Sequence, residues 1–295
     1  MQTVPEILKK IRKLELRTRR FVETAFAGQY HSVFKGRGMN FDEFRQYDFG
    51  DEIRSIDWNV TARMGEPFVR KYVEERELTV MLLIDVSASG TYGSTSASKR
   101  ELAAEVASLL AFCAIRNSDK VGLILFTDVV ELYIAPKKGR THILRLIREI
   151  LFYEPTGKKT DLAKPLDFLN RVTIRRAVVF VISDFQAENY EKALTICGRR
   201  HDLIAVVIED PGEQTLPAIG PVRVEDPETG GRFEIDFSNP RVRMEFGKRA
   251  EQERLEREAL FRRRSIDCIS LRTDQDYFPA LRSFFLRRES RLKGR

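Results

Sequence analysis

The sequence has little of what marks several large classes of protein. Its 295 residues contain three cysteines, Cys113, Cys197 and Cys268, which lie far apart and form no CxxC pair. Isolated thiols argue against a disulfide framework and a structural zinc site, and are typical of a reducing cytoplasm. No apolar run approaches the roughly 20 residues that cross a bilayer, and the N-terminus lacks the apolar stretch of a secretory signal. We therefore expect a cytoplasmic protein without a transmembrane segment.

Catalytic signatures are also scarce. The histidines are His31, His142 and His201, and none accompanies a Gly-x-Ser-x-Gly nucleophile motif. The sequence has no Gly-x-x-x-x-Gly-Lys-[Ser/Thr] loop, so we do not expect it to hydrolyse ATP by itself. We predict that the chain is not an enzyme.

Basic charge is concentrated in three segments, 1–20, 241–264 and 282–295, within a chain of net charge +7. In 241–264, Arg254 and Arg257 alternate with glutamates, which is typical of a solvated helix face. A surface for nucleic acid or for an anionic membrane is the alternative. We do not expect nucleic acid to be the partner.

From residue 78 onward, short apolar runs alternate with helical patterns. Continuous apolar runs are typical of strands buried on both faces of a parallel sheet. The alternation predicts an α/β fold with a doubly wound, mostly parallel sheet and helices on both faces. Strands are expected at 78–84, 121–126, 131–135, 177–182, 202–208 and 266–271, and helices at 99–115, 140–151, 162–172, 188–199, 239–264 and 277–287.

The expected organisation has three parts. Residues 1–77 form an extension with a helix at 5–24 and a strand and helix within 40–62. Residues 78–275 form the α/β domain, with a β-hairpin insertion near 209–238. Residues 276–295 form a C-terminal helix and basic tail.

Oxygen-bearing side chains follow the predicted strands. Asp85, Ser87 and Ser89 come directly after the first apolar run, Asp184 follows the run 177–182, and Thr160 lies in a loop before a helix. Ligands of doubly wound sheets bind at the carboxyl ends of the strands, where we expect these groups to meet. Carboxylates and hydroxyls suit a magnesium-like ion, whose open position attracts a partner's carboxylate. A metal-assisted hydrolase is a further alternative, although no base is evident.

Residues 78–271 resemble a von Willebrand factor A-like domain. The metal-ion-dependent adhesion site of that family combines an Asp-x-Ser-x-Ser loop with a Thr and an Asp on later loops. The resemblance implies that a divalent cation, Mg²⁺ or else Mn²⁺ or Ca²⁺, binds here and contacts an acidic residue of a protein client, and that the site can also be left unfilled. The implied metal ligands are Asp85, Ser87, Ser89, Thr160 and Asp184.

The block before the α/β domain carries a second resemblance. The segments GMNFDEFRQY (38–47), GDEIRSIDW (50–58) and AR (62–63) resemble the signature of the domain of unknown function 58 family. That family comprises bacterial and archaeal von Willebrand A-like proteins typically encoded beside a MoxR-type AAA+ ATPase. The resemblance implies that such an ATPase is a partner and that the chain acts as its adaptor.

The charged and aromatic residues of this block have two compatible interpretations. In the first they form a structural cover, in which the arginines pair with Asp42, Asp51 and Asp57 while Phe44, Tyr47 and Trp58 pack against a sheet. In the second they form a docking surface for the ATPase. The predicted partner-binding residues are Arg45, Asp51, Arg54, Asp57, Trp58 and Arg63.

Overall fold

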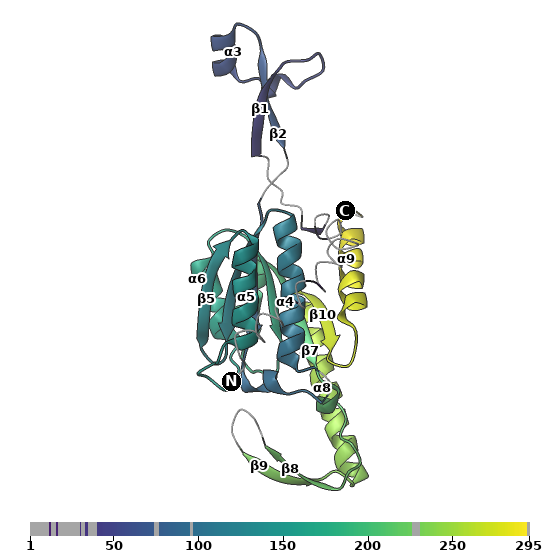
Figure 1. Cartoon of the computed structure of the whole chain (residues 1–295). Helices are drawn as coiled ribbons and strands as arrows, with labels where there is room; N and C mark the ends of the chain where they lie inside the picture. The colour runs from purple at the N-terminus through teal and green to yellow at the C-terminus, as the bar shows by residue number, and fades with distance from the viewer. Residues whose placement is uncertain are drawn as a thin grey trace. The chain divides into compact units, whose positions relative to one another are not determined.

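A computed structural model describes residues 12, 16, 30, 33–34, 40–73, 77–94, 97–225 and 231–293 (Figure 1). The chain divides into two compact units. Residues 34–78 form the first, which we call the arm, and residues 1–33 and 79–295 form the second, the core unit. The helix expected at 5–24 lies almost wholly outside the described residues.

The core unit is built on a six-stranded sheet with the strand order β10-β7-β6-β3-β4-β5. All neighbours are parallel except β5, which runs antiparallel to β4. The predicted doubly wound, mostly parallel sheet is therefore confirmed. The strands are β3 (Thr79–Asp85), β4 (Lys120–Phe126), β5 (Val130–Lys137), β6 (Val178–Ser183), β7 (Asp202–Glu209) and β10 (Asp267–Arg272).

Helices cover both faces of this sheet, which is why its central strands are apolar throughout (Figure 1). On one face, α4 (Lys99–Arg116) packs on α5 (Arg140–Phe152) and on the central strands. On the other, the buried side chains Leu166, Leu194 and Phe261 join Met81 and Val179 in one hydrophobic cluster. Leu166 lies on α6 (Ala163–Val172), Leu194 on α7 (Glu191–Arg200) and Phe261 in the C-terminal part of α8 (Pro240–Arg263).

The order of the strands reverses at β3. The next strand in sequence, β4, lies on one side of β3, and β6 lies on the other side. The carboxyl ends of β3 and β6 therefore flank the topological switch point, the position at which sheets of this kind bind ligands.

The C-terminal helix is longer than predicted. We expected it to end at residue 287, but α9 (Tyr277–Lys293) continues to Lys293 and packs against β10. Arg288 donates to Asp202 and Asp267, and Arg291 donates to Asp267. These bonds to the adjacent strands hold the last turns in place. The segment predicted as a basic tail is thus helical as far as it is described.

The inserted hairpin consists of β8 (Pro221–Glu225) and β9 (Arg232–Asp236), paired in antiparallel fashion. The arm contains its own antiparallel pair, β1 (Asn40–Gln46) and β2 (Phe68–Val73), with the short helix α3 (Trp58–Met64) between them. Within the described ranges, no helix has the length and apolar content needed to span a bilayer.

Candidate functional site

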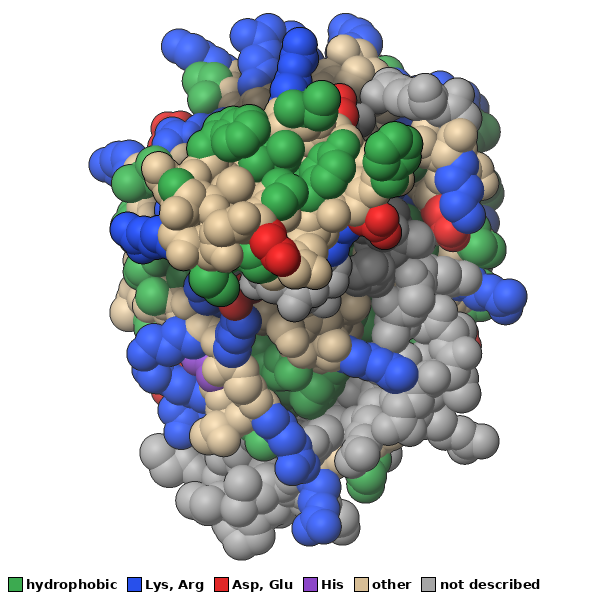
Figure 2. Space-filling model, turned by 90° about the horizontal axis from the view of Figure 1, so that it is seen from above, with side chains coloured by type: hydrophobic (Ala, Val, Ile, Leu, Met, Phe, Trp, Pro, Cys, Tyr) green, Lys and Arg blue, Asp and Glu red, His purple; other side chains and the backbone are tan. Residues whose placement is uncertain are grey.

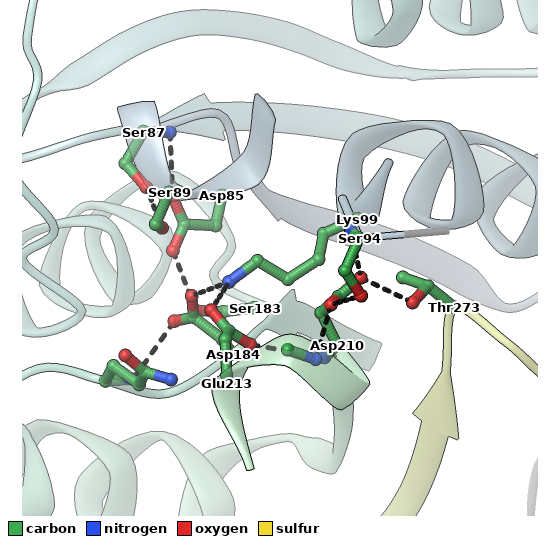
Figure 3. A network of polar contacts seen from close by, with 12 residues as sticks. Asp85, Ser87, Ser89, Ser94, Lys99, Ser183, Asp184, Asp210, Glu213 and Thr273 are labelled. Carbon is green, nitrogen blue, oxygen red and sulfur yellow. Dashed lines mark hydrogen bonds and ion pairs between the residues drawn. The ribbon is translucent and has the colours of Figure 1, made fainter. Parts of the chain in front are cut away.

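The Asp85 carboxylate lies at the end of β3 and is held by two hydrogen bonds. The Ser87 backbone N–H donates to Asp85 Oδ1 at 2.9 Å, and the Ser183 hydroxyl donates to Oδ2 at 2.7 Å (Figure 3). The Ser87 and Ser89 hydroxyls lie 3.0 Å apart. Alternate residues of the tight Asp-x-Ser-x-Ser turn therefore present their oxygens together, as predicted.

Asp184 follows β6 and lies beside the same turn. Asp85, Ser89 and Asp184 line one small pocket at the switch point. The Gln186 backbone N–H donates to Asp184 Oδ1 at 3.1 Å. The structure thus brings together the carboxylates that the sequence placed at the ends of two different strands.

Thr160 lies in a loop that runs beside the Asp85 turn. The Ala88 N–H donates to the Lys158 carbonyl at 3.2 Å, and the Asp161 N–H donates to the Thr127 carbonyl at 3.1 Å. Val86 is bonded in turn to the Phe126 carbonyl, at the end of β4. The loop carrying Thr160 is therefore anchored to the same edge of the sheet.

Lys99 is a member of this cluster that the sequence did not reveal. Its ammonium lies 2.7 Å from Asp184 Oδ2 and 2.5 Å from Glu213 Oε1, and its side chain is only 4% exposed (Figure 3). Both partners are remote in sequence, 85 and 114 residues away. No local pattern could have indicated them. Ser183 was also missed as a site residue, although its position at the end of a strand was a signal.

Burial shifts the pKa values of the charged groups in the cluster. Burial and the neighbouring Asp184 carboxylate raise the pKa of Asp85 to about 6. Burial alone would lower the pKa of Lys99, but the Asp184 and Glu213 carboxylates outweigh it and raise that pKa. Burial likewise raises the pKa of Glu213, in spite of Lys99. The carboxylates therefore compete for very little compensating positive charge.

A second polar network adjoins the first and fixes Glu213. Asp210, which is fully buried, accepts hydrogen bonds from the Ser94 N–H and hydroxyl and from the Thr273 hydroxyl (Figure 3). The Asp210 N–H donates to Glu213 Oε2 at 3.2 Å. The short helix Pro211–Glu213 is thereby tied to the loop before α4 and to the end of β10.

The residues predicted to bind a partner differ in their contacts and exposure. Arg45 and Asp51 form an ion pair at 2.6 Å. Asp57 caps α3, because its Oδ1 accepts from the Asn59 and Val60 N–H groups. Trp58 does not pack within the arm, because it is 66% exposed. Arg54 and Arg63 have no ion pair among the described residues.

The arm exposes several large apolar side chains. Hydrophobic side chains gather on the face seen in Figure 2. In the described part of the arm, the large exposed apolar side chains are Phe44, Phe49, Ile53, Trp58 and Met64.

The basic helices are largely compensated by neighbouring carboxylates. On α8, Arg249 pairs with Glu253, and Arg254 pairs with Glu251 and Glu258. On α9, Arg288 and Arg291 pair with aspartates of the sheet. These pairs agree with solvated helix faces that are partly neutralised by neighbouring carboxylates.

The fold and the cluster define an α/β protein with side-chain oxygens gathered at the switch point of its sheet. The chain belongs to the family described as "Protein of unknown function DUF58", which matches residues 43–256. This is the family predicted from the arm.

Two relatives in mycobacteria match the chain, one over nearly its whole length and one over about half of it. "Uncharacterized protein Rv1480" of Mycobacterium tuberculosis is 31% identical over 98% of this chain and 92% of its own. An uncharacterized protein of Mycobacterium avium is 34% identical over 48% of this chain and 84% of its own.

Among solved structures, the chain is similar to two proteins of Bacteroides. One is an aerotolerance-related membrane protein from Bacteroides fragilis, with a TM-score of 0.46 and 16% identity over 72% of this chain and 99% of that chain. The other is the conserved hypothetical protein BatB from Bacteroides thetaiotaomicron, with a TM-score of 0.41 and 16% identity over 74% of this chain and 100% of that chain.

Proposed function

We propose that this chain is a non-enzymatic protein-interaction module that binds an acidic side chain of a partner through a divalent cation. The observation that supports this most directly is the pocket at the switch point, which Asp85, Ser89 and Asp184 line together. The donor set consists of carboxylate and hydroxyl oxygens, which are the ligands that Mg²⁺ and Ca²⁺ prefer. The chemistry of the residues therefore fits such an ion.

The residues have distinct roles in this proposal. Mg²⁺, Mn²⁺ or Ca²⁺ would be held by Asp85, Ser87, Ser89, Thr160 and Asp184, and would supply an electrophilic position for an external carboxylate. Ser183 and the Ser87 N–H fix the two oxygens of Asp85. The bond between Ala88 and Lys158 keeps the Thr160 loop beside the Asp85 turn. The site is thus positioned by the backbone of three loops.

The composition of the pocket supports a binding role over a catalytic one. Its lining contains no histidine or cysteine among the described residues. Lys99 would be a poor general base, because Asp184 and Glu213 raise its pKa. Lys99 is therefore not suited to activate Ser89 as a nucleophile.

The arm is the proposed docking element for a MoxR-type AAA+ ATPase. Tryptophan, methionine and arginine are enriched in protein interfaces, and Trp58, Met64, Arg54 and Arg63 are all exposed on the arm. A partner surface with an apolar pocket and acidic residues beside it would complement these side chains. Two surfaces would then act together, with the arm holding the ATPase and the core site holding the client.

Binding to the cognate ATPase tests the proposal. The full chain would be measured against the ATPase and its client by pull-down and interferometry, with Mg²⁺ and with EDTA. Asp85→Ala would remove a metal ligand, and Trp58→Ser would remove the largest exposed side chain of the arm. We expect EDTA and Asp85→Ala to abolish client binding, and Trp58→Ser to abolish ATPase binding.

Two matched variants control for general effects. Glu188→Ala removes an exposed carboxylate of the core unit, and Phe233→Ser removes an exposed aromatic ring of β9. Neither should change binding. Client binding that persists equally in EDTA and in Asp85→Ala would refute the metal-mediated contact.

A further inference from the structure

Lys99 occupies an unfavourable place for a buried cation. It is the first residue of α4, and the N-terminus of a helix favours negative charge over positive charge. A buried ammonium also loses its hydration, so it persists only with close carboxylate partners. Lys99 has two, Asp184 and Glu213, at 2.7 Å and 2.5 Å.

The two partners of Lys99 differ in what else they do. Asp184 lines the pocket together with Asp85 and is one of the predicted metal ligands. Glu213 is absent from the pocket lining, and its second oxygen is fixed by the Asp210 N–H. Lys99 therefore bridges a site carboxylate and an anchored carboxylate outside the site.

The negative charge of the carboxylates at the pocket exceeds the positive charge that pairs with them. Asp184 and Glu213 share the single ammonium of Lys99, and Asp85 lines the same pocket. Arg100 also lines the pocket, but it donates to the carbonyls of Ile150 and Tyr153 and to no carboxylate found here. Arg257 contacts the Asp184 carbonyl and pairs with Glu209. The carboxylates of the site are thus only partly compensated.

We propose that Lys99 is a built-in counter-cation that competes with a divalent ion for Asp184 and thereby sets the affinity of the site. Without the ion, Lys99 neutralises Asp184. With the ion bound, Asp184 turns to the ion and Lys99 stays paired with Glu213, which needs no movement because Asp210 holds it. This inference rests on the proposed function, since it concerns the same site.

Titration of the full chain with Mn²⁺ by calorimetry, together with thermal unfolding at each Mn²⁺ concentration, tests this role. Lys99→Met removes the competing charge and keeps most of the side-chain volume. We expect it to bind Mn²⁺ about tenfold more tightly than the unsubstituted chain, because it removes the buried positive charge that pairs with Asp184. Its thermal stability should also rise more steeply with Mn²⁺.

A second variant predicts the opposite sign and does not remove the lysine. Glu213→Gln takes away the alternative partner, so Lys99 should hold Asp184 more firmly and Mn²⁺ affinity should fall several-fold. Lys164→Met removes an exposed lysine that pairs weakly with Asp161, at 3.5 Å, and controls for the change in net charge. Its Mn²⁺ affinity should stay within about twofold of the unsubstituted chain, because exposed charges are screened.

The outcomes separate this inference from the proposed function. Equal Mn²⁺ affinity in the unsubstituted chain and in Lys99→Met, or unchanged affinity in Glu213→Gln, would overturn the role of Lys99 and leave the metal site intact. Binding by Lys99→Met alone would support that role in its strongest form. No Mn²⁺ binding by any variant would overturn the inference and the proposed metal site together.

Discussion

The core site and the arm depart from the usual distribution of residues in opposite ways. The core site buries charge, since Lys99 and Asp184 are both nearly inaccessible. The arm exposes large apolar side chains, including Phe49 and Trp58. Charged residues are rarely buried unless paired, and clusters of exposed apolar groups mark interaction surfaces. Removing a buried charge should therefore cost stability, whereas removing an exposed ring should cost binding only.

The largest effect is expected from Lys99→Met in metal-free buffer. The substitution leaves Asp184 and Glu213 buried without their counter-charge, which costs about 3 kcal/mol of the free energy of unfolding. Urea unfolding with EDTA present measures it. Lys164→Met, at a lysine whose side chain is 58% exposed, should cost less than about 1 kcal/mol. If Lys99→Met lost no more free energy of unfolding than Lys164→Met, the buried pairs of Lys99 would not stabilise the fold.

His201, at the start of β7, is buried and ionisable but has no ion pair among the described residues. Burial lowers the pKa of His201 to about 4, and its Nδ1 accepts the Ala177 N–H at 3.2 Å. The folded chain therefore keeps His201 neutral, while the unfolded chain protonates it near pH 6.5. Its contribution to stability should be complete above that pH and decline by about 2 kcal/mol as the pH falls toward 4.

Urea unfolding between pH 7.5 and pH 4 checks this, with His201→Gln as the reference. Other titrating groups, including Asp85, cancel in the difference between the two proteins. The unsubstituted chain should lose more stability on acidification than the variant does. Parallel pH profiles would show that His201 is not held neutral.

A smaller effect is expected in the arm from Asp57→Ala. The variant loses the cap of α3, which costs about 1 kcal/mol of local stability. Amide hydrogen exchange should quicken in Trp58–Met64 and stay unchanged in the core unit, because the arm is a separate compact unit. Asp51→Ala, which breaks the exposed pair with Arg45 and the bond from the Asp48 N–H but leaves the cap of α3, serves as the control. Exchange that quickens equally in both variants would contradict the capping role.

The smallest effect on stability is expected from Trp58→Ser. An exposed side chain contributes little to folding, so the free energy of unfolding should change by no more than about 0.5 kcal/mol. The same variant should lose binding to the ATPase. A clear loss of stability would show that Trp58 packs in the folded protein, as the structural-cover interpretation expected.

The sheet was predictable from the sequence because its strands are simple patterns. The runs that became β3, β4, β6 and β7 are apolar throughout, since both faces of the sheet are covered. The meeting of Asp85 and Asp184 followed from the rule that parallel strands end at one edge. The grouping of Asp85, Ser87 and Ser89 was also predictable, because alternate residues of one tight turn lie close together.

Contacts between distant segments were not predictable. Lys99 has the appearance of an exposed lysine at the start of a helix, and only the folded chain shows that Glu213 and Asp184 surround it. The sequence predicted an ion pair for Asp57, and only the structure shows that this residue caps α3. Burial also decided whether Trp58 packs, and the aromatic pattern of the arm carries no information about that.

We propose that a divalent cation binds among the oxygens of Asp85, Ser87, Ser89, Thr160 and Asp184. Anomalous scattering from crystals of the full chain grown with Mn²⁺ would locate the ion itself. We expect one strong peak within coordination distance of the Asp85 and Ser89 side chains, absent from crystals of Asp85→Ala. A saturating Mn²⁺ soak that leaves this position empty, with Lys99 still bound to Asp184, would contradict it.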